Sequence, residues 1–202
     1  MVETGGACRF LGGMRMRGLM AAMAMVLAMV LAPGVAGAVD AGLCASCHGV
    51  AGVPADGTVP VIWGQRAEYL ARQLRDYRAG ARDNQIMSSV AEALSDADID
   101  ALSSYYGGQP WAGGALPAGE MPADVALCAG CHQPGFGGGE VAGVGAVPRL
   151  AGQQRGYLVQ TMQDYADGTR DDGAVMPPIM KALPEASRAA IAAWLGAAAG
   201  GK

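Results

Sequence analysis

The sequence predicts an all-α protein made of two similar helical domains in tandem. With an offset of 88 residues, residues 59–83 align with residues 147–171 at eleven identities in 25 positions. Such self-similarity indicates an internal duplication. In both segments apolar side chains recur at spacings of four and three residues, which is the period of an amphipathic helix. The stripes are Leu70, Leu74 and Tyr77 in one segment and Leu158, Met162 and Tyr165 in the other.

The first 38 residues have the features of an export signal. Arg9, Arg15 and Arg17 precede an uncharged apolar run, a Pro-Gly pair at 33–34 and the small residues Ala-Gly-Ala at 36–38. This order predicts a signal peptide over residues 1–38, cleaved after Ala38, and a periplasmic protein. The alternative is a retained anchor, because residues 18–39 carry no charge and are long enough to span a bilayer.

Composition excludes one class of partner and favours small domains. Of the 14 basic and 18 acidic residues, 3 basic and 1 acidic lie among the first 38. The rest of the chain has 11 basic and 17 acidic residues, a net charge of −6. That charge argues against nucleic-acid binding. The 32 glycines and 5% aromatic residues favour compact, loop-rich units. Units of this size usually need a cofactor, metal or disulfide for stability.

Two copies of one pentapeptide contain both histidines and, after signal removal, every cysteine. They read Cys-Ala-Ser-Cys-His at 44–48 and Cys-Ala-Gly-Cys-His at 128–132. The pattern C-x-x-C-H is typical of c-type haem attachment, in which two thiols bond the haem vinyl groups and the histidine ligates iron. The sequence therefore predicts two covalent haems. Their residues are Cys44, Cys47 and His48, and Cys128, Cys131 and His132.

Other uses of four cysteines fit less well. Three disulfide pairings are possible in an exported chain, but none requires a histidine after each second cysteine. Zinc ribbons place their two C-x-x-C pairs about 15–20 residues apart, closer than in this sequence. A thioredoxin-like site needs a βαβ context, which this chain does not show.

The internal repeat indicates the sixth iron ligands. No third histidine exists, so bis-histidine ligation within the chain is excluded, which leaves methionine, lysine, tyrosine, water or an open site. After a one-residue insertion the repeat pairs Met87 with Met176, and each lies eight residues before the start of a final helix, at Ser95 or Pro184. Met180 remains a competitor, although its partner position is Ala91.

The remaining methionines and the glycine-rich segments are predicted to have structural roles. Met162 falls within an apolar stripe and Met121 within a linker. Residues 134–148 are expected to form a loop at the haem edge, since no strand–loop–helix order supports a phosphate site. Residues 109–121 are predicted to link a first domain, 39–108, to a second, 122–202.

The whole chain after residue 38 resembles the diheme cytochrome c4 family. The resemblance is carried by "CASCHG" and "CAGCH", by "VPVIWGQ" and "VPRLAGQ" with the helices after them, and by "QIMSSVAEALSDADIDALSSYY". It implies two class I cytochrome c domains, each wrapped around one haem. One departure is that only five residues precede Cys44 after the expected cleavage site, where the family has a full helix.

The resemblance also implies the iron ligands and the residues that orient them. The axial pairs would be His48 with Met87 and His132 with Met176. Pro60 and Pro148 would offer their carbonyls to the ring N–H of the two histidines, an arrangement that orients the imidazole.

The expected function is one-electron transfer rather than catalysis. An iron with histidine and methionine ligands has no open position, and methionine raises the reduction potential. The expected partners are a quinol-oxidising complex as donor and a terminal oxidase as acceptor. The alternative is a haem subunit of a periplasmic dehydrogenase, of the flavocytochrome or alcohol-oxidising type. A diheme peroxidase would need a vacant iron, which two matching methionines argue against.

Overall fold

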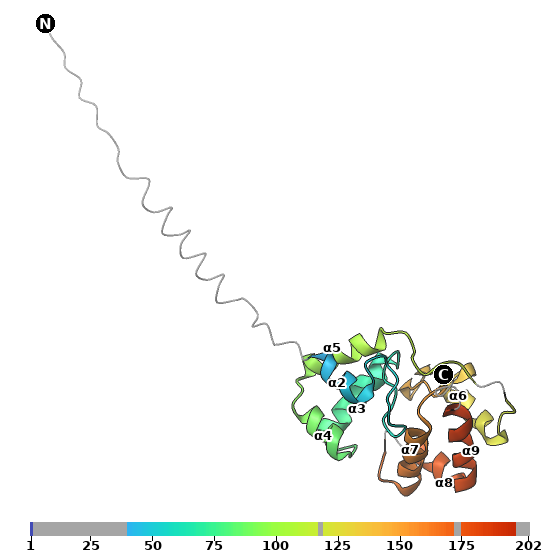
Figure 1. Ribbon diagram of the computed structural model, residues 1–202. Helices are drawn as coiled ribbons and strands as arrows, with labels where there is room; N and C mark the ends of the chain where they lie inside the picture. Colours follow the sequence, from blue (N-terminus) through green and yellow to red (C-terminus); the bar gives the residue numbers. More distant parts are fainter. Residues whose placement is uncertain (2–39, 117–118, 172–174, 197–202) are drawn as a thin grey trace. The chain divides into compact units, whose positions relative to one another are not determined.

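The computed structural model describes Met1 and residues 40–116, 119–171 and 175–196 (Figure 1). Residues 39–202 form one compact unit that is mostly helical. The expected signal peptide and the alternative membrane anchor both fall on residues outside the described part. Among the residues that are described, no helix is long and apolar enough to cross a membrane.

An N-terminal lobe contains the first four helices of the described residues. They are α2 (Ala41–His48), α3 (Ala67–Arg78), α4 (Gln85–Glu92) and α5 (Asp96–Gly107). Its core is built on one face of α5, where Ile99, Leu102 and Tyr106 are at most 5% exposed. The predicted start of α5 is confirmed, since Ser95 and Asp98 form a reciprocal capping box.

A C-terminal lobe contains the second set of elements. They are η1 (Ala123–Cys128), α6 (Ala129–His132), η2 (Pro134–Phe136), β1 (Gly139–Val141), β2 (Gly145–Val147), α7 (Arg155–Asp167), α8 (Met176–Ala182) and α9 (Glu185–Gly196). The predicted stripe Leu158, Met162 and Tyr165 is buried in this core, so Met162 has the packing role expected of it. Trp194 is half-buried against Phe136, with ring centroids 5.7 Å apart.

The loop expected at residues 134–148 is partly a β-hairpin, which corrects the sequence prediction. Strands β1 and β2 pair antiparallel, with Gly139 opposite Val147 and Val141 opposite Gly145. Each strand has only three residues, too few to show the alternation of a strand in sequence. Gly143 lies in the connecting turn at φ 77°, a conformation that glycine adopts without strain.

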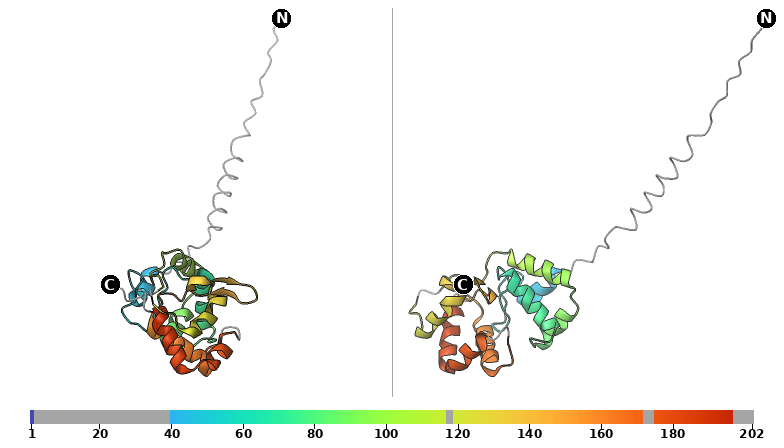
Figure 2. Two further views of the ribbon diagram at one scale, coloured as in Figure 1. Left: turned by 90° about the vertical axis from the view of Figure 1, so that its right-hand side faces the viewer. Right: turned by 180° about the vertical axis from the view of Figure 1, so that it is seen from behind.

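The two lobes contact each other through one hydrogen-bond pattern used twice. Gln65 accepts from the backbone N–H of Arg149 at 2.7 Å and donates to its carbonyl at 3.1 Å. Gln153 makes the same two contacts with Val61, at 2.8 and 3.0 Å. Both pairs sit at equivalent positions of the 88-residue repeat. The lobes, visible side by side in Figure 2, therefore meet with approximate two-fold symmetry.

The segment expected to link the lobes packs against the second of them. The indole N–H of Trp111 donates to the Ala151 carbonyl at 2.9 Å. Gly113 and Gly152 approach so closely that a side chain on Gly152 would clash with the backbone of Gly113. This part of residues 109–121 is thus held in place rather than spanning open solvent.

Candidate haem sites

Helix α2 presents the first C-x-x-C-H motif. The Asp40 carboxylate accepts from the Gly42 N–H at 2.8 Å and caps the helix, which then runs for eight residues to His48. At spacings of three and four residues, Cys44, Cys47 and His48 lie on neighbouring positions of one helix. The helix is short, as expected, yet it still contacts α5, because the Tyr106 hydroxyl donates to the Ala41 carbonyl.

The second motif is built differently. Cys128 ends the 3₁₀ turn η1, and α6 covers only the four residues up to His132. All four described cysteines are free thiols, so the structure does not show the disulfide alternative. Burial raises the pKa of the Cys44 and Cys128 thiols, which favours their neutral form.

Each histidine is buried and held by a proline carbonyl. His48 Nδ1 lies 2.8 Å from the carbonyl oxygen of Pro60, and His132 Nδ1 lies 3.0 Å from that of Pro148. A carbonyl can only accept, so Nδ1 carries the proton and Nε2 keeps a lone pair for a metal. Burial lowers the pKa of His48, with the Pro60 hydrogen bond opposing it, which favours the neutral, ligating form.

The methionines divide into two environments. Met87, in the first turn of α4, and Met176, at the start of α8, are both half-buried. Met180 is 2% exposed within the C-terminal core, and its repeat partner Ala91 is fully buried. Equivalent positions thus share an environment, and Met180 has the surroundings of a core residue.

One cavity of about 1200 Å³ brings the predicted residues together. Both C-x-x-C-H motifs contribute to its lining, as do Met87, Met176 and Met180. The volume exceeds the roughly 300–1,000 Å³ of a pocket for one small ligand. Apolar side chains such as Leu70, Leu74 and Leu158 supply its walls. Thiols, imidazoles held through Nδ1, thioethers and apolar walls together fit c-type haem.

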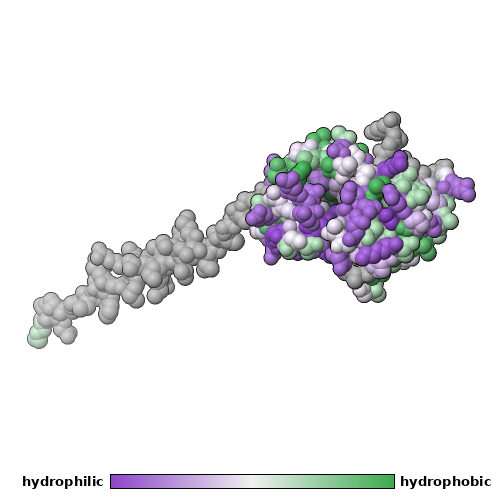
Figure 3. Space-filling model, turned by 90° about the horizontal axis from the view of Figure 1, so that it is seen from below, coloured by the Kyte–Doolittle hydropathy of each residue, from purple (hydrophilic) through white to green (hydrophobic). Residues whose placement is uncertain are grey.

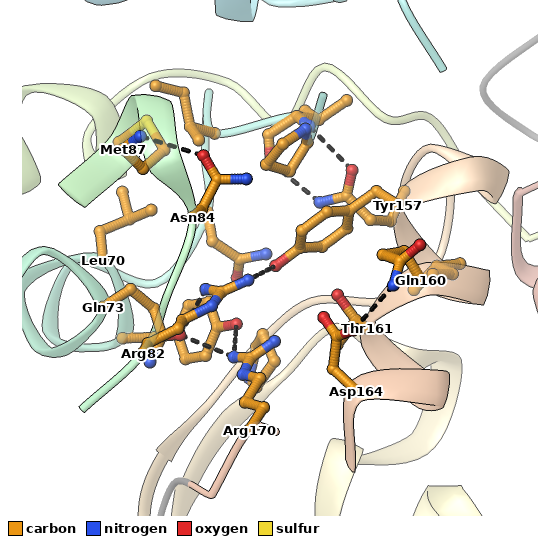
Figure 4. Close-up of a pocket in the computed structure, with 18 of the residues that line it drawn as sticks. Leu70, Gln73, Arg82, Asn84, Met87, Tyr157, Gln160, Thr161, Asp164 and Arg170 are labelled. Atoms are coloured by element: carbon orange, nitrogen blue, oxygen red, sulfur yellow. Dashed lines mark hydrogen bonds between the residues drawn. The ribbon is translucent and has the colours of Figure 1, made fainter. Parts of the chain in front are cut away.

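The sequence prediction missed a polar cluster in the same cavity. Figure 4 shows Gln73, Arg82, Tyr157 and Arg170 turned toward one another, and the Tyr69 hydroxyl accepts from Arg170 at 3.1 Å. A signal was present in the repeat. Tyr69 and Tyr157 are identical partners, and so are Arg82 and Arg170, although neither pair belongs to the apolar stripes.

Comparison with known proteins gives consistent matches. The Cytochrome c family model matches residues 121–198. A solved cytochrome c4 from Acidithiobacillus ferrooxidans is 32% identical with a TM-score of 0.60, over 76% of this chain and 97% of that one. Cytochrome c4 of Thiocapsa roseopersicina is 30% identical over 168 residues, 76% of this chain and 86% of the relative. The chain belongs to the diheme cytochrome c4 family.

Membership in the cytochrome c4 family establishes the fold, cofactor type and general role. The lobes have the class I cytochrome c fold, the cofactor is haem c, and the chain transfers electrons rather than catalysing a reaction. A further relative of this cytochrome c4 chain is the "Thiosulfate dehydrogenase electron acceptor" of Thiomonas intermedia. It is 35% identical over 178 residues, 78% of this chain and 79% of the relative.

Proposed function

We propose that this chain is a periplasmic carrier of single electrons with two haems, one in each lobe. Cys44 and Cys47 would attach the first, with His48 and Met87 as axial ligands. Cys128 and Cys131 would attach the second, with His132 and Met176. The observation that carries the proposal is the pair of histidine–proline hydrogen bonds, because in both repeats a proline carbonyl faces Nδ1 and the histidine lines the shared cavity beside its two cysteines.

Bound haem supplies the reversible one-electron couple, and the chain's own residues prepare its surroundings. The proline carbonyls fix the orientation and tautomer of each imidazole. The Asn84 side chain, which accepts from the N–H groups of Ile86 and Met87 at 3.2 and 3.0 Å, holds Met87 in the first turn of α4. Leu102, Tyr106 and Leu195 lie among the buried walls of the cavity and keep water out.

The proposed setting is the periplasmic side of a respiratory chain. The chain would be exported by a signal peptide over residues 1–38, with haem domains at 39–108 and 122–202 joined by 109–121. A quinol-oxidising complex would donate electrons and a terminal oxidase would accept them. The net charge of −6 after signal removal favours docking to a basic surface. Hydrophilic side chains cover much of the face shown in Figure 3.

A second candidate function is that of the haem-carrying, electron-transferring subunit of a periplasmic dehydrogenase. It is favoured by the 35% identity to a protein named as the electron acceptor of thiosulfate dehydrogenase. Copurification from the periplasm separates the two candidates. A stable complex with a catalytic subunit would support the second, whereas a free chain reduced by a quinol-oxidising complex would support the first.

The main test is the mass and spectrum of the matured protein. We expect two haem masses, an N-terminus at Val39, and the weak long-wavelength band of sulfur-to-iron charge transfer from both haems. Reduced protein should resist carbon monoxide at neutral pH. Met87→Leu and Met176→Leu should each remove about half of the band and open one haem, because each removes one proposed thioether ligand.

Met180→Leu is the matched control, since it removes a thioether while nearly conserving volume. It should leave both bands intact. If Met180→Leu opens a haem and Met176→Leu does not, the ligand assignment in the C-terminal lobe is wrong. A matured protein without haem would overturn the proposal as a whole.

A further inference from the structure

One peptide unit in the N-terminal lobe is hydrogen-bonded at both ends. Its carbonyl, on Pro60, lies 2.8 Å from His48 Nδ1. Its N–H, on Val61, donates to Gln153 Oε1 at 2.8 Å, and this glutamine belongs to the C-terminal lobe. The carbonyl and the N–H of a peptide unit share one conjugated system. The group that orients His48 is therefore itself held from the other lobe.

The C-terminal lobe has the same arrangement with the lobes exchanged. The carbonyl of Pro148 lies 3.0 Å from His132 Nδ1. The N–H of that peptide unit, on Arg149, donates to Gln65 Oε1 at 2.7 Å. Gln65 and Gln153 are partners in the 88-residue repeat. Each lobe thus contributes a glutamine to the peptide unit that orients the histidine of the other lobe.

The two glutamine amides are fixed by their own surroundings. Both residues are only 3% exposed. Gln153 Oε1 also accepts from the N–H of Gln154, at 2.8 Å. Gln65 Oε1 also accepts from the N–H of Arg66, at 2.9 Å. Because only the oxygen of an amide accepts, two N–H donors determine which end of each side chain faces the peptide unit of the other lobe.

We propose that Gln65 and Gln153 are positioning residues that act across the lobes, and that each tunes the iron ligand of the other lobe through one peptide unit. The proposal rests on the proposed function, because it requires iron on both histidines. An N–H that donates to a buried amide oxygen polarises its peptide group, so the carbonyl at the other end becomes a stronger acceptor. A stronger acceptor at Nδ1–H makes the imidazole more basic, which stabilises ferric iron and lowers the reduction potential. Removing one glutamine should therefore raise the potential of the haem in the other lobe.

A role of the glutamines in packing alone predicts the opposite change. Weaker contact between the lobes would admit water, and water stabilises the additional charge of ferric iron. Both potentials would then fall. Loss of the hydrogen bond to the peptide unit should instead raise one potential, in the opposite lobe. The sign of the shift and the lobe in which it occurs separate the two roles.

The test uses haem-loaded protein and compares Gln153→Leu with a control, Gln154→Leu. The control removes a neighbouring contact between the lobes, from Gln154 Nε2 to the Pro54 carbonyl at 3.2 Å, which lies outside both peptide units that face the histidines. The measurements are the potential of each haem, from redox titrations followed by NMR, and the solvent exchange of each Nδ1–H in reduced protein. Gln153→Leu should raise the potential of the haem bound by His48 and speed the exchange of its Nδ1–H. Gln154→Leu should change neither.

Gln65→Leu is the reciprocal test. It should raise the potential of the haem bound by His132 and leave that of the haem bound by His48 near its wild-type value. A fall of both potentials in either variant would overturn the proposal. Equal shifts in Gln153→Leu and Gln154→Leu, or a shift confined to the lobe that contains the substitution, would overturn it as well.

Gln153→Glu tests the same contact without removing the acceptor, and it serves if Gln153→Leu does not fold. In its protonated form the new carboxyl group accepts from the Val61 N–H and donates to the Val61 carbonyl, as the native amide does. Burial raises the pKa of a carboxyl group, so at mildly acidic pH the potential should match that of wild type. Once ionised, the carboxylate is a stronger acceptor, so His48 Nδ1–H should exchange more slowly and the potential of its haem should fall. Exchange that stays unchanged across this titration would contradict the proposal.

Failure of this inference is distinguishable from failure of the proposed function. Protein with two haems and intact charge-transfer bands, but without a shift in the opposite lobe, would contradict this inference alone and leave the proposed function standing. Matured protein without haem would contradict the proposed function itself.

Discussion

The two lobes place a methionine at equivalent positions but start its helix by different means. In the N-terminal lobe, the Asn84 side chain caps α4 and Met87 lies in the first turn. In the C-terminal lobe, Met176 begins α8, followed by Pro177 and Pro178, and no side chain of the described residues caps the helix. Proline suits the first turn because its missing N–H would have no helical partner there. The duplication has kept the residue while the local structure that presents it has diverged.

The cores of the lobes also differ in size. Among the residues that the structure describes, five buried ones form the N-terminal hydrophobic cluster, against eleven in the C-terminal cluster. The C-terminal lobe also has the β-hairpin, whose residue Ala146 accepts from Arg72 of the other lobe at 3.1 Å. Since small cores stabilise a fold only marginally, the N-terminal lobe should depend more on its haem.

The largest expected effect comes from removing one haem at a time. Replacing both Cys44 and Cys47 with alanine should cost one haem mass and most of the helicity of the N-terminal lobe. The matched pair, Cys128→Ala with Cys131→Ala, should cost one haem mass but less helix, because the larger core remains. Mass spectrometry and far-UV circular dichroism measure both. Equal loss of helix in the two variants would contradict the difference between the cores.

A large effect on stability, without an effect on the haems, is expected at Met180. Met180→Ala leaves a cavity in the C-terminal core and should lower the free energy of unfolding by about 2–5 kcal/mol. Met180→Leu should cost less than about 1.5 kcal/mol. Denaturant titration gives the free energies, and both variants should keep the charge-transfer bands. A band lost in either one would mean that Met180 is a ligand.

Periodicity and repeat alignment predicted the parts of the structure that depend on local pattern. The core position of Met162 followed from apolar spacing, and the start of α5 at Ser95 was also predicted. The hairpin was missed because three-residue strands carry no readable alternation. The cluster around Gln73 was missed because its members are distant in sequence, and only the packing of the lobes brings them together.

A smaller effect is expected at the cap of α4. Asn84→Ala removes the acceptor for two N–H groups and should lower the free energy of unfolding by about 1 kcal/mol. Since Met87 lies in the turn that loosens, the charge-transfer band of one haem should disappear at a lower temperature. Val175→Ala is the control at the equivalent end of α8, where Val175 itself makes no side-chain cap. Identical band melting in both variants would show that the cap does not hold Met87.

The smallest effect on stability is expected when low pH protonates the Asp98 carboxylate in the first turn of α5. Hydrogen bonds from the hydroxyl and backbone N–H of Ser95 hold the pKa of Asp98 below its usual range. A carboxyl group whose pKa is lowered by folding stabilises the folded state at pH values above its unfolded-state pKa, which is about 3.9. This stabilisation is lost as the pH falls through the folded-state pKa. Asp98→Asn should therefore be less stable than wild type at neutral pH and approach it below about pH 4. Thermal melts across this range, with Glu185→Gln in α9 as the control, measure the effect. If the wild-type and Asp98→Asn melting temperatures stay parallel at every pH, the capping carboxylate does not contribute through its charge.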